Sequence, residues 1–268
     1  MLSIRKNAPR GRFFIAAVSG ILYLLPGLLC AANDVCGMDG STATLVIRYV
    51  IDGDTVKLVD GTNLRLVGLD TPELGREGKA DEPGAIAARD YLVELLSENS
   101  GLPVVYDAER YDRHGRMLGH LFLSDGRNIQ ALLLAGGYGT LLVIPPNLKY
   151  IDCYRSRERE AIVQRRGIWS NPRYRVMDVE ELGPATRGYH RVSGRVSRIG
   201  QSSSSFWINL GENLALRIVR SDLKYFKGID LLHLRDRTVL GRGWVYLRNG
   251  ELRMRIRHPV DMQINWRQ

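Results

Sequence analysis

Five charged residues in three short segments are the side chains of this chain that could do chemistry together. Asp54 lies in Ile-Asp-Gly-Asp-Thr. Arg65, Asp70 and Glu73 lie in Leu-Arg-Leu-Val-Gly-Leu-Asp-Thr-Pro-Glu, and the last segment, Asp-Arg-His-Gly-Arg, ends at Arg116. Carboxylates suit a hard cation such as calcium, a free carboxylate can take a proton from water, and a guanidinium can hold two phosphate oxygens. The set predicts metal-dependent hydrolysis of a phosphodiester.

Taken singly, these residues also have structural interpretations. Aspartate is common in turns, which alone would account for Asp54, and an isolated arginine such as Arg65 is commonly a surface residue of a strand. Asp-Gly-Asp-Thr and Asp-x-x-Gly-Arg are weak signals, whereas Arg-x4-Asp-Thr-Pro-Glu is a specific one. All three segments are present in order, and this combination favours one joint site.

The order and spacing of these segments resemble those of the staphylococcal nuclease (thermonuclease) family, over about residues 44–169. The resemblance implies that Asp54, Asp70 and the backbone carbonyl of Thr71 bind calcium. With few protein ligands, such a site keeps coordination positions for water and phosphate, so we expect weak metal binding until nucleic acid arrives. Whether manganese or magnesium substitutes for calcium stays open.

The same resemblance assigns the catalytic roles. It implies that Glu73 activates or orients the attacking water, and that Arg65 and Arg116 contact the scissile phosphate. One segment departs from the family pattern, because residues 141–147 contain no aromatic side chain where tyrosines often flank the nucleotide. His114 occupies another position where a tyrosine can lie, and it is either a phosphate or base contact or a plain loop residue.

Strands and helices of a small barrel are expected to position these residues. Turn signals and apolar spacing predict three strands between residues 44 and 69, two more near 104–109 and 117–123, and helices near 83–99, 128–135 and 147–166. Five strands with three helices are the layout of an OB-type Greek-key barrel, mainly β with α. The family resemblance implies the same fold.

The remainder of the chain predicts a second, smaller β-rich domain. We expect a catalytic domain at residues 33–170, a linker at 171–188 that is rich in proline and glycine, and a β-rich, possibly OB-like domain at 189–268. Its strands are expected at 190–199, 205–210, 214–219, 239–247 and 251–257, with a short helix at 222–227. The Asn249-Gly250 pair is a hairpin signal.

The N-terminus has the order of a secretory signal peptide, with a basic stretch, an apolar run over residues 13–29 and small residues that favour cleavage after Ala32. An uncleaved membrane anchor is the alternative. Cleavage would leave two cysteines, Cys36 and Cys153, which an oxidising compartment would join as a disulfide. The protein is therefore expected to be secreted or periplasmic, with a membrane contact only if the segment is retained.

Charge is unevenly distributed along the chain. Residues 33–187 carry 19 Lys and Arg against 23 Asp and Glu, whereas residues 188–268 carry 15 against 6. The basic third suggests a surface that faces a polyanion, although a generally basic protein would show the same excess. Alternation places Arg253, Arg255 and Arg257 on one face of a strand, which with Trp207 and Trp244 suits single-stranded nucleic acid. A solvated sheet face is the alternative.

Together these features predict an exported, calcium-dependent endonuclease acting on DNA and RNA, preferably single-stranded, with no obligate protein partner. The rival interpretation is a non-catalytic nucleic-acid-binding protein. Domains that have lost the chemistry usually lack some of the carboxylates or arginines, and this chain has them all. The physiological substrate and the oligomeric state are not encoded in the pattern.

Overall fold

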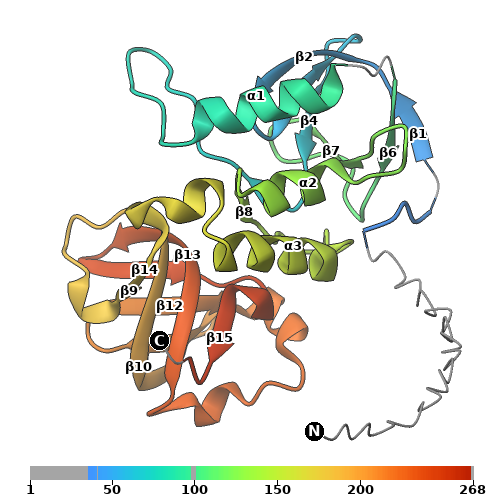
Figure 1. Cartoon of the computed structure of the whole chain (residues 1–268). Helices are drawn as coiled ribbons and strands as arrows, with labels where there is room; N and C mark the ends of the chain where they lie inside the picture. The colour runs from blue at the N-terminus through green and yellow to red at the C-terminus, as the bar shows by residue number, and fades with distance from the viewer. Residues whose placement is uncertain (1–35, 41, 98–100, 267–268) are drawn as a thin grey trace, which may run out of the picture. The chain divides into compact units, whose positions relative to one another are not determined.

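The computed structural model describes residues 36–40, 42–97 and 101–266, and residues from Val35 to Gln268 form one compact unit (Figure 1). The signal peptide predicted at residues 1–32 lies outside the described residues. Across the described part of the chain, no helix is long and apolar enough to cross a membrane. The mixture of helices and strands expected from the sequence is confirmed.

The first half is built on a six-stranded sheet. Its strands are β1 (Thr42–Leu45), β2 (Ile47–Asp52), β3 (Thr55–Leu58), β4 (Asn63–Leu66), β6 (Leu102–Val105) and β7 (Met117–Leu121). They are hydrogen-bonded in the order β1-β6-β7-β4-β3-β2, with β4 and β7 parallel and the other pairs antiparallel. Only Val46 separates β1 from β2, so the two ends of the row are continuous in the chain.

Three helices accompany this sheet, as predicted: α1 (Ala85–Leu96), α2 (Ile129–Gly136) and α3 (Ile151–Val163). Helix α1 lies against β2, and α2 lies beside α3 (Figure 1). The side chain of Asn128 accepts a hydrogen bond at the start of α2, and Gly137 ends that helix with a φ of 74°. Helix α3 begins later than expected because Tyr150, with a φ of 61°, cannot belong to a right-handed helix.

The second half repeats the same pattern of pairing. Its strands are β9 (Val176–Asp178), β10 (Gly188–Gln201), β11 (Ser205–Leu210), β12 (Leu214–Val219), β13 (Thr238–Arg248), β14 (Glu251–Arg255) and β15 (Met262–Ile264). The pairings β10–β11–β12–β14–β13–β10 form a closed circuit in which only β12 and β14 run parallel. In the first half the corresponding order is β2–β3–β4–β7–β6–β1, and there only β4 and β7 run parallel.

Several details of the second half differ from the sequence prediction, among them strand β15, which was not expected. The segment at 171–188, expected to be a linker, contains β9, which pairs in parallel with β10. Turn-forming residues bounded this short strand, so the sequence pattern hid it. The helix expected at 222–227 is instead a 3-10 helix, Arg220–Phe226.

Each half has its own apolar core, and a third cluster joins elements from the two. Ala161 of α3 packs with Trp169, Tyr174 and Tyr189, the last of which belongs to β10. Val260, which follows β14, packs against the core of the first half. The predicted disulfide is present: Cys36 and Cys153 are bonded with their Cα atoms 5.3 Å apart, which ties the segment before β1 to α3.

A buried ion pair also connects the halves. Arg242 of β13 binds Glu158 of α3 through both guanidinium Nη atoms, with Nη2 2.7 Å from Oε1. Nη1 donates to Oε2 of Glu158, and Nη2 also donates to the carbonyl of Leu141, 2.9 Å away. Glu158 is 2% exposed. Removing one partner of a buried pair leaves an uncompensated charge and lowers stability. Because its two partners come from different halves, we expect this contact to couple the stability of the second half to that of the first.

We therefore expect Arg242→Met to lower the free energy of unfolding by about 3–5 kcal/mol, the usual cost of leaving a buried charge unpaired. The matched control is Arg195→Met, because Arg195 pairs with Asp236 at the surface with 73% of its side chain exposed. That control should cost less than about 1 kcal/mol. Urea unfolding measures both, and equal losses would show that the pair is not what joins the halves.

Candidate active site

Asp54 lies in the turn between β2 and β3, and its carboxylate is 4% exposed. Its Oδ2 accepts hydrogen bonds from the backbone nitrogen of Thr71 at 3.0 Å and from the Thr71 hydroxyl at 3.2 Å. The preceding residue must be glycine, because a Cβ at Gly53 would lie 2.7 Å from both the Thr71 hydroxyl and the Cβ of Ala88 in α1. The Asp-Gly-Asp-Thr segment thus brings the β2–β3 turn against the segment that follows Asp70.

Arg65 of β4 bridges two of the predicted metal ligands. Its Nη1 lies 2.9 Å from Oδ2 of Asp54, and its Nη2 lies 3.1 Å from Oδ1 of Asp70. Nη1 also donates to the carbonyl of Leu69 at 2.8 Å, and the side chain is 12% exposed. Arg65 is therefore held between the two carboxylates, with a fixed position at the edge of the site.

Asp70 lies at the end of β5 (Leu69–Asp70), which pairs with β8 (Thr140–Leu141). Burial, together with the charge of Asp54, raises the pKa of Asp70 to about 6, although Arg65 acts in the opposite direction. The side chain of Trp244, in β13, also favours the ionised carboxylate and lowers its pKa. Trp244 and Asp70 line one small pocket, so the second half of the chain reaches a predicted metal ligand.

Two neighbouring carboxyl groups share this electrostatic situation. Partial burial, and then the charges of Asp54, Asp52 and Asp70, raise the pKa of Glu73. Burial and the charge of Asp54 likewise raise the pKa of Asp52. Within the described residues the carboxylate of Glu73 forms no hydrogen bond or ion pair, and its residue is exposed. A free carboxylate with a raised pKa is suited to accept a proton.

Arg116 is positioned by a tight loop. Oδ1 of Asp112 accepts from the backbone nitrogens of His114 and Arg116, at 2.8 and 3.0 Å, while Oδ2 accepts from Nε of Arg116 at 2.7 Å. Gly115, with a φ of 75°, completes the turn. Nη1 and Nη2 of Arg116 bind no other described residue, so the two donors that could hold a phosphate remain available.

A pocket of about 600 Å³ gathers most of these side chains. Its lining includes Arg65, Asp70, Glu73 and Arg116. A second pocket of about 600 Å³ holds Asp52 and Asp54 and shares Glu73 and Arg116 with the first. The structure therefore brings all five predicted residues to one region, with Thr71 as the hydrogen-bond partner of Asp54. That the backbone carbonyl of Thr71 is a metal ligand stays a prediction.

The pocket also contains residues that the sequence reasoning missed as members of this site. Tyr111, 56% exposed, lines it beside His114, and so do Arg255 and Arg257 of the second half. Tyr111 supplies an aromatic side chain to this pocket, whereas residues 141–147 contain no aromatic side chain. It directly precedes the Asp112 loop, which is the signal that could have identified it.

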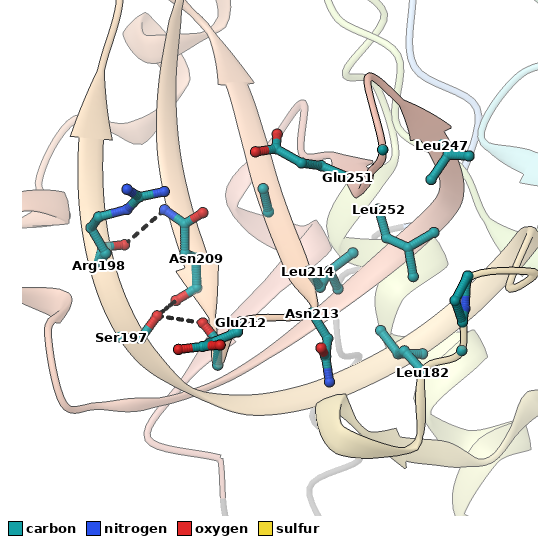
Figure 2. Close-up of a pocket in the computed structure, with 15 residues that line it drawn as sticks. Leu182, Ser197, Arg198, Asn209, Glu212, Asn213, Leu214, Leu247, Glu251 and Leu252 are labelled. Carbon is teal, nitrogen blue, oxygen red and sulfur yellow. Dashed lines mark hydrogen bonds between the residues drawn. The ribbon is translucent and has the colours of Figure 1, made fainter.

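A different pocket of about 600 Å³ lies wholly in the second half, as Figure 2 shows. It is formed by Leu182, Leu214 and Leu252 together with polar side chains such as Arg198, Asn209 and Glu212. None of the residues predicted to be catalytic lines it. The chemistry therefore belongs to the pocket at Asp70 and Glu73.

The donor set near Asp54 fits a hard cation. Carboxylate oxygens are the ligands that calcium prefers, and Arg65 supplies one positive charge to the two carboxylates that it bridges. The raised pKa of Asp70 reflects burial and the charge of Asp54, both of which a bound cation would offset. Among the described residues there is no cluster of three or more His, Cys, Asp or Glu side chains in a metal-binding arrangement.

The profile of the family described as "Staphylococcal nuclease homologue" matches residues 63–171. This stretch includes Arg65, Asp70, Glu73 and Arg116, and it begins after Asp54. Two Bacillus subtilis (strain 168) proteins, the "SPbeta prophage-derived endonuclease YokF" and "Endonuclease YncB", are each 35% identical over 136 residues. The matches cover 48% of this chain, and 45% and 63% of those proteins, so the chain aligns with about half to two thirds of their length.

The "Thermonuclease" of Staphylococcus hyicus is 33% identical over 129 residues, which is 47% of this chain and 75% of the relative. That of Staphylococcus intermedius is 32% identical over 127 residues, which is 46% of this chain and 74% of the relative. Both matches cover most of a thermonuclease at an identity that indicates common descent. The chain belongs to the staphylococcal nuclease family.

Proposed function

We propose that this protein is an exported, calcium-dependent endonuclease that hydrolyses phosphodiester bonds of DNA and RNA. One observation carries the proposal: Arg65 bridges the carboxylates of Asp54 and Asp70 beside the unpaired carboxylate of Glu73. The endonucleases and thermonucleases among its relatives support the same activity.

Asp54 and Asp70 would hold the cation, with the carbonyl of Thr71 as a further ligand. When bound, calcium supplies positive charge that stabilises the charge developing on the phosphate. The chain's own contribution is to keep Asp54 in place through Thr71, whose backbone nitrogen and hydroxyl both donate to it. Asp70 is kept ionised by Arg65 and Trp244, which act against burial.

Glu73 is the proposed general base. Its carboxylate lines both pockets and has no competing partner in the described structure, so it can accept the proton of an attacking water. A positioned base contributes about 10²–10⁴-fold, while enzymes lower reaction barriers by about 8–23 kcal/mol. Most of the acceleration must therefore come from the cation, the arginines and the alignment of the reactants.

Arg116 is the proposed phosphate clamp, because Asp112 fixes its Nε while its Nη1 and Nη2 have no partner among the described residues. Arg65 would join it at the phosphate once a cation takes over the neutralisation of Asp54 and Asp70. These contacts go to phosphate oxygens and not to the sugar, which supports action on both DNA and RNA. Family resemblance supports 3′-phosphate products and a preference for single strands.

The disulfide between Cys36 and Cys153 supports export, because such bonds persist in oxidising compartments. Processing after Ala32 would leave both cysteines in the mature chain. The repeated pairing order of the strands supports an OB-type barrel in each half, with the parallel β4–β7 and β12–β14 pairs in equivalent places.

Cleavage of denatured DNA by the mature protein tests the activity. We expect calcium to support cleavage and a chelator to abolish it. We expect Glu73→Gln to lower kcat by about 10²–10⁴-fold, because the amide cannot take the proton, and to leave substrate binding nearly unchanged. The matched control is Glu94→Gln, an exposed residue of α1, which should retain full activity. Cleavage that persists in chelator, or none in calcium, would contradict the proposal.

Arg116→Lys tests the phosphate clamp separately. Lysine keeps the charge but cannot present two parallel donors, so we expect turnover to fall more than about tenfold. The chain offers a matched control in Arg127, whose Nε likewise donates to an aspartate, Asp125, at 2.7 Å. Arg127 lines neither pocket at the site, so Arg127→Lys should cleave at the normal rate. A near-normal rate for Arg116→Lys would rule out the bidentate role.

A further inference from the structure

We propose that the second half of the chain forms one wall of the active-site pocket, and that Arg255 and Arg257 bind phosphates of the substrate strand next to the bond that is cleaved. The proposal rests on the proposed function, since it assigns these arginines to the same substrate. It identifies the second half as part of the substrate-binding site instead of a separate nucleic-acid-binding module.

The location of the two arginines is the first support. The pocket that holds Arg65, Glu73 and Arg116 is lined on its other side by Asp222, Arg255 and Arg257. A small adjoining pocket places both arginines beside Asp70 and Trp244. Arg255 ends β14 and Arg257 lies two residues further on, so both line the pocket from the end of that strand.

Arg257 is an unpaired cation. Its guanidinium forms no hydrogen bond or ion pair within the described residues, where only its backbone nitrogen is bonded, to Asp261. Burial and then the charge of Arg255 lower the pKa of Arg257. Two like charges that face one pocket favour an anion between them, and a phosphate is an anion that guanidinium groups bind well.

Arg255 is only partly satisfied by the protein. Its Nη2 donates to Oδ2 of Asp222 at 3.0 Å, and its Nε is buried without a partner in the described structure. Within the described residues its Nη1 has no partner either, and Nη1 is not enclosed as Nε is. The Asp222 contact therefore holds the guanidinium in place and leaves Nη1 as the donor for a phosphate in the pocket.

Three other arginines of the second half have partners within the protein. Arg242 forms a buried ion pair with Glu158. Arg253 binds Glu251 and lies 4.8 Å from the centre of the Trp207 ring, which Arg217 also approaches, at 5.6 Å. Trp207 therefore serves as a partner for these cations and is not a free stacking surface. Only Arg255 and Arg257 combine access to the pocket with unused donors.

The acidic residues of the pocket indicate why positive charge from Arg255 and Arg257 is needed there. The pocket also contains Asp70, Glu73, Glu109 and Asp112, whose charges repel a phosphodiester strand. Residues 33–187 carry an excess of acidic residues, and the basic excess belongs to residues 188–268. Arg255 and Arg257 bring part of that positive charge to the place where the strand must approach carboxylates.

Binding of a fluorescent single-stranded oligonucleotide in chelator, followed by anisotropy at several salt concentrations, tests the proposal without cleavage. We expect Arg257→Gln to weaken binding about tenfold at low salt, the loss that follows from removing one charge-assisted hydrogen bond. The negative slope of log K against log salt should become less steep by about 0.7, which corresponds to the loss of one phosphate contact to a single strand. Arg257→Lys should retain the slope, because it retains the charge.

Arg195→Gln is the matched control, since Arg195 pairs with Asp236 at the surface and lies outside the pocket; it should bind with the wild-type slope. Arg257 carries the test because its side chain has no protein partner to lose, whereas Arg255→Gln would leave Asp222 unpaired. Wild-type affinity and slope in Arg257→Gln would overturn the inference while leaving the nuclease activity standing. A wild-type protein that binds but does not cleave in calcium would overturn the proposed function instead.

Discussion

The site depends on the buried carboxylate of Asp54. Three donors converge on its Oδ2, namely the nitrogen and hydroxyl of Thr71 and the guanidinium of Arg65. This one contact set joins the β2–β3 turn to the segment after β5, although the residues are 17 positions apart. One guanidinium faces both Asp54 and Asp70, with Glu73 and Asp52 close enough for all their charges to interact. Such a site is short of positive charge, which a bound cation can correct.

The second half of the chain also stabilises this site, through contacts to strand β8. Arg242 binds Glu158 and the carbonyl of Leu141, and Glu158 accepts from the nitrogen of Leu141. Leu141 lies opposite Leu69 in the β5–β8 pair, so the buried ion pair supports the short strand that ends at Asp70. Trp244, two residues after Arg242, then reaches the Asp70 carboxylate. Residues beyond the end of the family match therefore help Arg65 to hold Asp70 in place.

Local signals allowed much of this arrangement to be predicted from the sequence. Asp54 and the Arg65–Glu73 segment lie at turns and strand ends whose residue types favour those conformations, and the disulfide followed from the two cysteines that the predicted signal-peptide cleavage would leave. Other features depend on contacts between distant segments. Nothing adjacent to Arg242 indicates that it pairs with Glu158, 84 positions earlier, or that Arg255 and Arg257 line a pocket made largely by the first half. Strand β9 was missed because only its pairing with β10 identifies it.

The central claim is that Asp54 and Asp70 together hold a cation, and calorimetric titration of calcium into the mature protein tests it most directly. The account predicts one weak site in the free protein that tightens when a single-stranded oligonucleotide is present, under conditions of slow cleavage. Asp54→Asn should abolish that binding, because the amide removes one of the two anionic ligands. Asp125→Asn, in an exposed turn outside the site, should bind calcium normally. A wild-type protein that takes up no calcium, or an Asp54→Asn variant that binds it equally well, would contradict the account.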